Sequence, residues 1–355
     1  MTKQEQAKRG IEEWLGSGEY AVGSKLPTIL QMADLLGVKE QPVRQAVRML
    51  VEAGRLRTVN GVGIFVRDPA EAAQRIMLLT NKPSSRGGIG WFLGWEVIQG
   101  IEEALGVRGW DGVHYFHQAN GDWREQLLRA YKAGACSGMI LVSGVREERL
   151  RNLLKALRSE QVVNADFANQ PSWMNEVKVR FAPGMVSILS HALELGHRDF
   201  GFIYGRNVAD SWTHAERYRV FVEFCRDKDV PIDPACMIDS GGSAMDGYRA
   251  TIRLLDTGKK ITCIYAVSDD RCEGAMQAMR DRGLEPGKDI SVIGFDDMPD
   301  AEELGLATVR LPRVEVGREA VALLERAQAE KLTDETVWLD SEAVIRPSLA
   351  KPRAK

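Results

Sequence analysis

The chain has 355 residues, of which 44% are hydrophobic and 27% are charged, and its formal net charge is −3. This length exceeds that of a usual single domain, and the composition excludes a disordered polyelectrolyte and a globally basic protein, so nucleic-acid contact would need a local patch. The polar start of the sequence and the lack of any run of about 18 apolar residues predict neither a signal peptide nor a membrane span, and hence a cytoplasmic chain.

Three helices are predicted in the first part of the chain. Apolar residues at helical spacing indicate a first helix that ends near Gly16. Thr28 and Gln31 have the spacing of a capping box that begins the second helix, and Gly37 supplies its stop. The third helix follows the turn at Gly37 and runs to about Ala53.

The third helix has two different faces. Its buried stripe consists of Val43, Val47, Leu50 and Val51, and its other face carries Gln41, Arg44, Gln45 and Arg48. A polar face of this kind fits the DNA major groove, where Arg matches guanine edges and Gln matches adenine. Phosphate pairing by the arginines would instead fix position without reading sequence, and the sequence leaves both roles open.

A hairpin follows the third helix, because residues 56–66 form two short apolar runs around Asn60 and Gly61. Three helices and a hairpin in this order predict a winged helix, and the alternative is a helical bundle whose arginines are only solvated. Ten basic and eight acidic side chains give residues 1–68 a net charge of +2, while the remainder carries −5. This asymmetry favours DNA binding weakly.

Five segments of this region resemble the GntR-family winged helix: residues 23–27, 33–38, 43–47, 52–54 and 61–66. The resemblance covers nearly all of residues 8–67. We expect DNA contacts from Thr28, Lys39, Gln41, Arg44, Gln45, Arg48, Arg57, Asn60 and Gly61.

The chain departs from the GntR pattern at two places. Thr28-Ile29-Leu30 replaces the common Ser-Glu-Arg, and Lys39-Glu40 replaces the common Ser-Arg. Two DNA-contacting arginines of the family are therefore missing, and Glu40 would repel phosphate. We expect modest affinity per monomer and binding as a homodimer to an operator with two half-sites.

From Arg75 onward, β-type runs alternate with amphipathic helical patterns, which predicts two similar lobes of parallel α/β sheets. The runs are residues 75–80, 138–142, 200–204, 263–267 and 290–295. The glycine-rich tract at 87–90 is predicted to form a loop near the mouth of a cleft. We expect a winged-helix domain at 1–68, a linker at 69–74, and an effector-binding and dimerisation domain at 75–355.

Catalytic and metal-binding motifs are missing from this second region. His191 and His197 are six positions apart on a predicted helix, off the i, i+3 or i, i+4 spacing of a shared metal site, and no phosphate loop or nucleophile elbow occurs. The five cysteines are odd in number and show no CxxC spacing, so we expect reduced structural thiols. We therefore expect no enzyme, no metal and no cofactor.

Several segments resemble the LacI/GalR regulator domain, itself similar to periplasmic sugar-binding proteins: residues 191–203, 289–297 and 345–348, and more weakly 99–104, 138–142 and 307–310. In order they cover residues 75–349. The combination with the first domain resembles arabinose-repressor-like GntR regulators. It implies an operator-binding repressor whose small effector, a sugar or sugar derivative, lies between two lobes.

The resemblance implies an effector site at strand ends, formed by Asp166, Arg217, Ser268, Asp269 and Asp296. Carboxylates accept hydroxyl protons, Arg donates a planar fork, and an aromatic ring covers the apolar side of a sugar. The aromatic candidates are Trp91, Trp95 and Trp212.

Several alternatives stay open at this point. Asp269 could equally cap its helix, and each tryptophan could belong to the core. Ser268 stands where the LacI/GalR family usually has Asn, and Phe167 where Arg often follows the Asp. A regulator without effector binding is therefore one alternative. A solute-binding protein, which would require export, is another.

Overall fold

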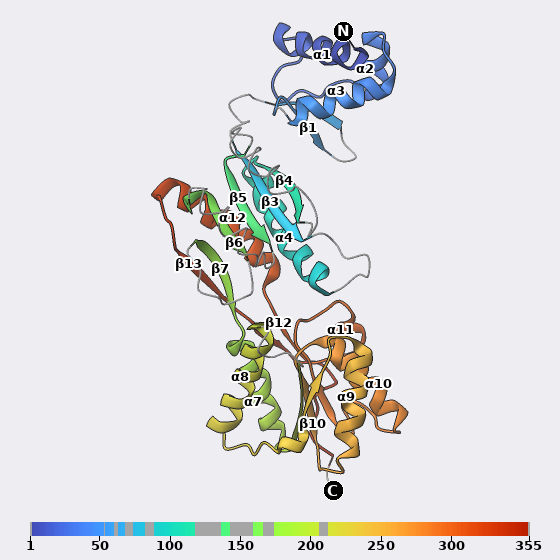
Figure 1. Cartoon of the computed structure of the whole chain (residues 1–355), viewed down its shortest axis with the longest axis vertical. Coiled ribbons are helices and arrows are strands. Elements are labelled where there is room, and N and C mark those ends of the chain that lie inside the picture. Colours follow the sequence, from blue (N-terminus) through green and yellow to red (C-terminus); the bar gives the residue numbers. More distant parts are fainter. Residues whose placement is uncertain are drawn as a thin grey trace.

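The computed structural model describes residues 2–52, 54–59, 63–67, 74–81, 89–117, 136–142, 159–165, 174–205 and 212–353. Figure 1 shows a small helical head at the N-terminus, followed by two lobes arranged along the long axis of the molecule. The proposed boundaries at 68 and 74 fall between the last strand of the head, which ends at Val66, and the first strand of the body, which begins at Arg75.

The head consists of α1 (Lys3–Ser17), α2 (Ile29–Leu36), α3 (Glu40–Glu52) and the antiparallel strands β1 (Leu56–Val59) and β2 (Gly63–Val66). The predicted capping box is present, since the Thr28 hydroxyl accepts from the Gln31 N–H. Gly18 and Gly37 end α1 and α2 in the left-handed conformation, which glycine adopts without the steric cost of a Cβ.

One apolar core holds the head together, with Ile11, Met32, Val43, Leu50 and Leu56 almost completely buried. These residues come from all three helices and the hairpin. The helices therefore bury their apolar stripes against one another and leave the opposite faces to solvent.

The first lobe contains a six-stranded parallel sheet in the order β13-β7-β6-β5-β3-β4. Its strands are β3 (Arg75–Asn81), β4 (Asp111–His117), β5 (Gly138–Val142), β6 (Val162–Ala165), β7 (Asn175–Arg180) and β13 (Thr336–Asp340). A short 3₁₀ helix at Ser159–Gln161 precedes β6. The helices α4 (Ile89–Val107) and α12 (Arg313–Glu330) pack closely against each other.

Two glycines permit this close approach of α4 and α12. A Cβ added to Gly100 would lie 1.9 Å from the Val314 carbonyl oxygen, and one added to Gly317 would lie 2.1 Å from the Val97 carbonyl oxygen. The glycine-rich tract was predicted as a loop over 87–90, but α4 already begins at Ile89. That prediction was wrong for Ile89 and Gly90, because the burial of Val97 and Ile101 on the same helix outweighs the low helix propensity of glycine.

The second lobe contains a four-stranded parallel sheet in the order β11-β10-β8-β9. Its strands are β8 (Phe200–Gly205), β9 (Met237–Ser240), β10 (Cys263–Ala266) and β11 (Ser291–Ile293). Its helices are α7 (Ala182–Leu195), α8 (Trp212–Asp227), α9 (Ala244–Asp256), α10 (Asp269–Asp281) and the short α11 (Asp300–Glu303). A 3₁₀ turn at Pro234–Cys236 precedes β9. The strand predicted over 290–295 is shorter than expected. After Ile293, the N–H groups of Gly294 and Asp296 donate to the carbonyls of Ala307 and Val309, outside the sheet.

The chain crosses between the lobes three times. The crossings run from β7 into α7, from β12 (Thr308–Arg310) into α12, and from β13 into β14 (Glu342–Val344), which pairs with β12. Ser341 joins two of them, because its hydroxyl donates to the Phe181 carbonyl at 2.9 Å and accepts from the Gly184 N–H at 3.1 Å. These three segments form the hinge.

All five cysteines are buried free thiols, as predicted. Within the described ranges, no helix combines the length and apolar composition that a membrane crossing would need.

Candidate DNA-binding face and effector site

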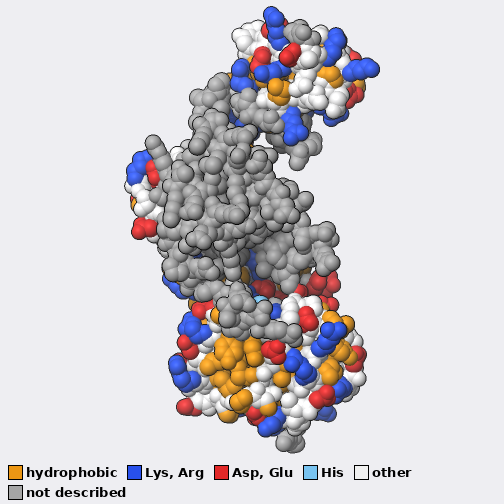
Figure 2. Space-filling view, viewed as in Figure 1, with side chains coloured by type: hydrophobic (Ala, Val, Ile, Leu, Met, Phe, Trp, Pro, Cys, Tyr) orange, Lys and Arg blue, Asp and Glu red, His pale blue; other side chains and the backbone are white. Residues whose placement is uncertain are grey.

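The third helix of the head presents a polar face to solvent. Gln41, Arg44, Gln45 and Arg48 are all exposed, while Val43, Val47 and Leu50 on the opposite side are buried. The predicted division of α3 into two faces is therefore observed, although Val51 is only half-buried. Figure 2 shows basic side chains distributed over the visible surface of this head.

An ion pair within α3 restrains one of these arginines. The Arg44 guanidinium donates to the Glu40 carboxylate at 2.9 Å, one helical turn away, and both side chains are about half exposed. Glu40 therefore neutralises part of the positive charge that this face would offer to phosphate. Such an exposed pair is weak, so DNA could replace Glu40 as the partner of Arg44 at little cost.

The other predicted DNA contacts lie around α3. Lys39 and Gln41 line one shallow groove beside the α2–α3 turn. Thr28 is exposed, but its hydroxyl serves the cap of α2. The Arg57 guanidinium lies over the ring of Phe65, 5.3 Å from the ring centroid, and Asn60 and Gly61 fall outside the described residues.

Two arginines connect the head to the first lobe. Arg67, which follows β2 and is only 4% exposed, forms an ion pair with Asp111 at the start of β4. Arg75, at the start of β3, donates to the Val51 carbonyl in the last turn of α3. The end of α3 and the end of the hairpin are therefore both attached to the lobe that follows them.

In the second lobe, polar side chains gather where the parallel strands end. Arg217 comes from α8, which follows β8, while Ser268 follows β10 and Asp296 follows β11. Strand order reverses around β8, since β10 lies on one side of it and β9 on the other. Ligands of open parallel sheets bind at such a reversal, outside the carboxyl ends of the strands.

Arg217 and Asp296 form a buried ion pair. The Arg217 Nη2 lies 2.9 Å from Asp296 Oδ1, and the two side chains are 7% and 4% exposed. Arg217 also donates to the Val267 carbonyl, and its guanidinium lies 3.7 Å from the centroid of the Phe295 ring. These contacts fix the plane of the guanidinium, yet its buried Nε has no hydrogen-bond partner.

The loop that carries Asp296 has an unusual backbone. Asp296 and Asp297 have φ values of 120° and 53°, in the region that favours glycine. Residues held in this region concentrate at functional sites, where the surrounding structure must impose the conformation. Arg313 contributes to this by donating to the Asp296 carbonyl, and Asp297 accepts from Arg346 at 2.7 Å.

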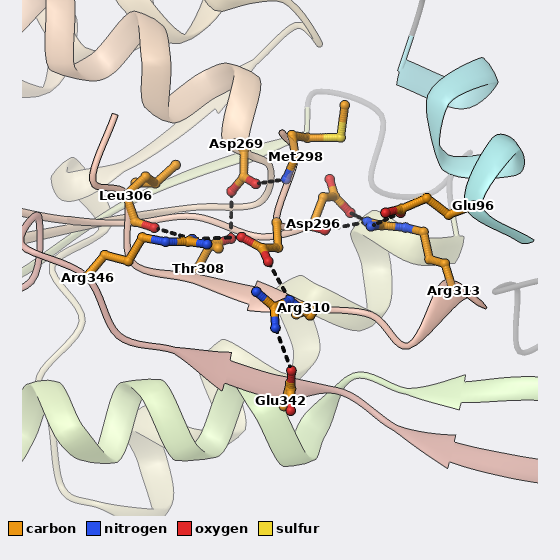
Figure 3. Close-up of polar contacts among 11 residues, drawn as sticks. Glu96, Asp269, Asp296, Met298, Leu306, Thr308, Arg310, Arg313, Glu342 and Arg346 are labelled. Carbon is orange, nitrogen blue, oxygen red and sulfur yellow. Dashed lines mark hydrogen bonds and ion pairs between the residues drawn. The ribbon is translucent and has the colours of Figure 1, made fainter. Parts of the chain in front are cut away.

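Asp269 holds that loop in place rather than capping its own helix. Its carboxylate accepts from the Met298 N–H at 2.8 Å and from the Thr308 hydroxyl at 2.6 Å (Figure 3). Burial, followed by the nearby charge of Asp296, raises the pKa of Asp269 to about 7. The cap interpretation was therefore wrong, because the N-cap position of α10 is Ser268 and Asp269 is already the first helical residue, with its carboxylate directed to Met298 and Thr308.

A network of arginines connects this loop to the first lobe across the hinge. Arg313 lies between the Asp296 carbonyl and the carboxylate of Glu96 on α4, which is 2.9 Å from Arg313 Nη1 (Figure 3). Arg310 connects Asp297, at 2.5 Å, with Glu342 on β14, at 3.1 Å. The sequence interpretation missed these contacts, since no local motif pairs Arg313 with a residue 217 positions away.

The same hinge segments line a cavity of about 430 Å³. Its charged lining is mainly acidic, with Glu96, Asp297, Glu315, Asp340 and Glu342 facing Arg310 and Arg313. The cavity therefore lies directly beside the loop that holds Asp296.

His214 lies on α8 beside Arg217, over the end of β8. A Cβ added to Gly205 would lie 2.4 Å from its Nδ1. Burial and then the charges of Arg217 and Arg271 lower the pKa of His214 to about 4, so its imidazole is neutral at physiological pH. A neutral ring can both donate and accept a hydrogen bond at this position.

The remaining predicted effector residues are placed only in part. Asp166 lies outside the described residues. Trp91 and Trp95 belong to α4 rather than to a loop, and Trp212 is the first residue of α8, with the side chains of Trp91 and Trp212 outside the described part. Trp95 is 51% exposed.

Comparison with known proteins agrees with this two-part organisation. Residues 3–66 match the family of bacterial regulatory proteins named gntR, and residues 189–349 match the periplasmic binding protein-like domain. The HTH-type transcriptional repressor PurR of Yersinia pestis bv. Antiqua is 23% identical over 259 residues, covering 72% of this chain and 75% of the relative.

Solved structures show the same fold. A regulatory protein of the LacI family from Chloroflexus aggregans superposes with a TM-score of 0.67 at 23% identity, covering 77% of this chain and 98% of that one. A LacI-family transcriptional regulator from Enterococcus faecium with bound ribose gives 0.62 at 20% identity, covering 79% and 100%. The Lac repressor dimer bound to operator and an anti-inducer gives 0.64 at 19% identity, covering 78% and 94%.

A head that matches bacterial regulatory proteins, joined to a two-lobed body that matches the periplasmic binding protein-like domain, defines a transcription regulator rather than an enzyme. More specifically, its head matches the gntR family of bacterial regulatory proteins and its body matches the periplasmic binding protein-like domain, with the fold of the LacI-family structures.

Proposed function

We propose that this protein is a repressor that binds operator DNA in the cytoplasm as a homodimer and is controlled by a sugar or sugar derivative bound between its lobes. The observation that carries this proposal is the joint presence of a solvent-exposed recognition helix and the Arg217–Asp296 site in one chain. The PurR relative is a repressor, and one structural neighbour holds ribose, which supports both parts of the proposal.

On the DNA side, the face formed by Gln41, Arg44, Gln45 and Arg48 enters the major groove. Lys39, Thr28 and the wing with Arg57, Asn60 and Gly61 contact the flanking backbone. Glu40 limits what one head can contribute, so two heads on two half-sites supply the affinity. The Lac repressor neighbour, which is a dimer bound to its operator, supports this arrangement.

On the effector side, the Arg217 Nε and the Asp296 carboxylate are oriented before the ligand arrives. Ser268 supplies a hydroxyl, and Asp269 keeps the Asp296 loop in its strained conformation. A polyol suits this set because adjacent hydroxyls can donate to Asp296 and accept from Arg217. Asp166, Trp91, Trp95 and Trp212 complete the proposed site from the facing lobe and the surrounding helix starts.

Coupling between the sites follows the contacts across the hinge. An effector that displaces the Asp296 loop also displaces Arg313, and Arg313 holds Glu96 on α4. The first lobe in turn holds the head through Arg67 and Arg75. A ligand shifts the equilibrium only by its difference in affinity for the two hinge states, and the coupling is reciprocal.

The DNA-binding part is tested by selecting an operator from a random duplex library and measuring its affinity by fluorescence anisotropy. Arg44→Ala with Arg48→Ala should weaken binding at least about tenfold, because each bidentate arginine contact contributes about 1–3 kcal/mol. Arg9→Ala, which removes an exposed arginine of α1 paired with Glu13, is the matched control. Undiminished binding by the double variant would show that α3 does not read DNA.

A further inference from the structure

A second arginine lies at the proposed effector site and has no ion-pair partner in the part of the chain that the structure describes. Arg271 belongs to the first turn of α10 and is 3% exposed. Its Nη1 donates to the Ser268 hydroxyl at 2.7 Å, and its buried Nε has no partner. Among the described residues, no carboxylate forms an ion pair with it.

This arrangement is unusual for a buried cation, since removing a guanidinium from water costs several kcal/mol unless an anion compensates it. The other buried arginines of the second lobe and hinge have such compensation. Arg217 pairs with Asp296, and Arg313 pairs with Glu96. The only hydrogen-bond partner of Arg271 among the described residues is a neutral hydroxyl, so Asp296 and Asp270 attract it without forming an ion pair with it.

The nearby acidic groups do not fill that role. Asp296 pairs with Arg217 at 2.9 Å and lies 3.8 Å from Arg313, and the oxygens of Asp269 accept from Met298 and Thr308. Asp270, the next residue on α10, is half-buried; burial followed by the charges of Asp296 and Glu273 raises its pKa to about 6, while the charge of Arg271 lowers it. The neutral His214 adds no charge of either sign.

The position of Arg271 also suits a ligand. Ser268 lies two residues after the end of β10 and is the N-cap residue of α10, but its side chain makes no cap hydrogen bond, so its hydroxyl is available to the site and to Arg271 together. The positive end of the 13-residue helix α10 points the same way. Two other buried oxygens of the same lobe, the Tyr265 hydroxyl and the Ser240 hydroxyl at the end of β9, have no partner among the described residues either.

We propose that the effector is an anion, a sugar-like molecule carrying a phosphate or carboxylate group that Arg271 and Ser268 bind while Arg217 and Asp296 bind its hydroxyls. This inference rests on the proposed effector site and specifies its ligand class. The oxyanion forms an ion pair with Arg271. Arginine is well suited to this role because its planar guanidinium matches the geometry of both phosphate and carboxylate.

The first test needs no identified effector. The melting temperature is measured in inorganic phosphate and in sodium chloride of equal ionic strength, for the wild type, Arg271→Met and Arg271→Lys. Phosphate should stabilise the wild type, and Arg271→Met should abolish that gain while Arg271→Lys keeps part of it. In chloride, Arg271→Met should melt at the same temperature as the wild type or higher, because it removes a buried charge that forms no ion pair with the described residues. A lower melting temperature would identify Arg271 as a structural residue and overturn the inference.

The second test compares matched ligands by isothermal titration: ribose with ribose 5-phosphate, and galactose with galacturonate. At least one charged member should bind the wild type about tenfold or more tightly than its neutral partner, and Arg271→Met should remove this preference. The phosphate and carboxylate pairs distinguish the two kinds of anion. Equal binding of neutral and charged members would overturn the inference and leave the proposed sugar site intact. The inference would also be overturned if no anion raised the melting temperature of the wild type. The operator measurements above test the regulator function independently.

Discussion

Replacing Arg217 by Met tests whether the buried ion pair organises the second lobe. The substitution keeps much of the side-chain volume but leaves the Asp296 carboxylate, which is 4% exposed, without the cation 2.9 Å away and with Arg313 at 3.8 Å as the remaining cation. Breaking a buried pair by removing one partner costs about 3–5 kcal/mol, and the lower end of this range applies because Arg313 compensates part of the charge. At about 2–4 °C per kcal/mol for a domain of this size, calorimetry should show a loss of about 6 °C or more.

Arg219→Met is the matched control, because Arg219 lies on the same helix and pairs with Glu216 at 2.7 Å but is 52% exposed. An exposed pair contributes about 0–1 kcal/mol, so this variant should melt within a few degrees of the wild type. The double variant Arg217→Met with Asp296→Leu removes both charges and should recover much of the loss. If Arg217→Met were no less stable than Arg219→Met, the pair would not be the organising contact described here.

Three further variants follow from other contacts. Glu40→Gln should tighten operator binding several-fold in anisotropy titrations, because it releases Arg44 and removes a charge that repels phosphate; equal or weaker binding would contradict this. Gly317→Ala should destabilise the first lobe by about 3 kcal/mol or more in calorimetry, since the added Cβ would lie 2.1 Å from the Val97 carbonyl oxygen. The control Gly106→Ala, which has open space around the added Cβ, should stabilise the same lobe by up to about 1 kcal/mol. Burial lowers the pKa of His197, so the contribution of its neutral ring to stability is complete above about pH 6.5 and is lost as pH falls. The drop in melting temperature from pH 7.5 to pH 5 should therefore be smaller for His197→Gln than for the wild type. An equal drop would exclude His197 as the cause.

The head could be predicted closely from sequence because its determinants are local. Thr28 with Gln31, and Gly37 as the stop, define α2 within a few residues of one another. The two faces of α3 follow from helical periodicity alone. The prediction of a loop over residues 87–90 was wrong at Ile89 and Gly90 because the determinants there are not local. The start of α4 depends on packing against strands and the helix α12, which lie far away in the sequence.

The effector site was predicted through the rule that ligands lie at strand ends, together with family resemblance, and the structure does bring Arg217, Ser268 and Asp296 to one edge of the second sheet. It could not be predicted that Arg217 and Asp296 would bind each other, or that Arg271 would lack an anion. Both facts depend on side-chain geometry between segments that lie far apart in the chain.

The account depends most on one coupling: a ligand at the Arg217–Asp296 site must change how the head binds DNA. The direct measurement is operator affinity with and without a compound that raises the melting temperature of the wild type. The affinity should change by about fivefold or more in the presence of that compound, and the operator should change the affinity for the compound by the same factor. A compound that binds this site tightly and leaves operator affinity unchanged would contradict the account.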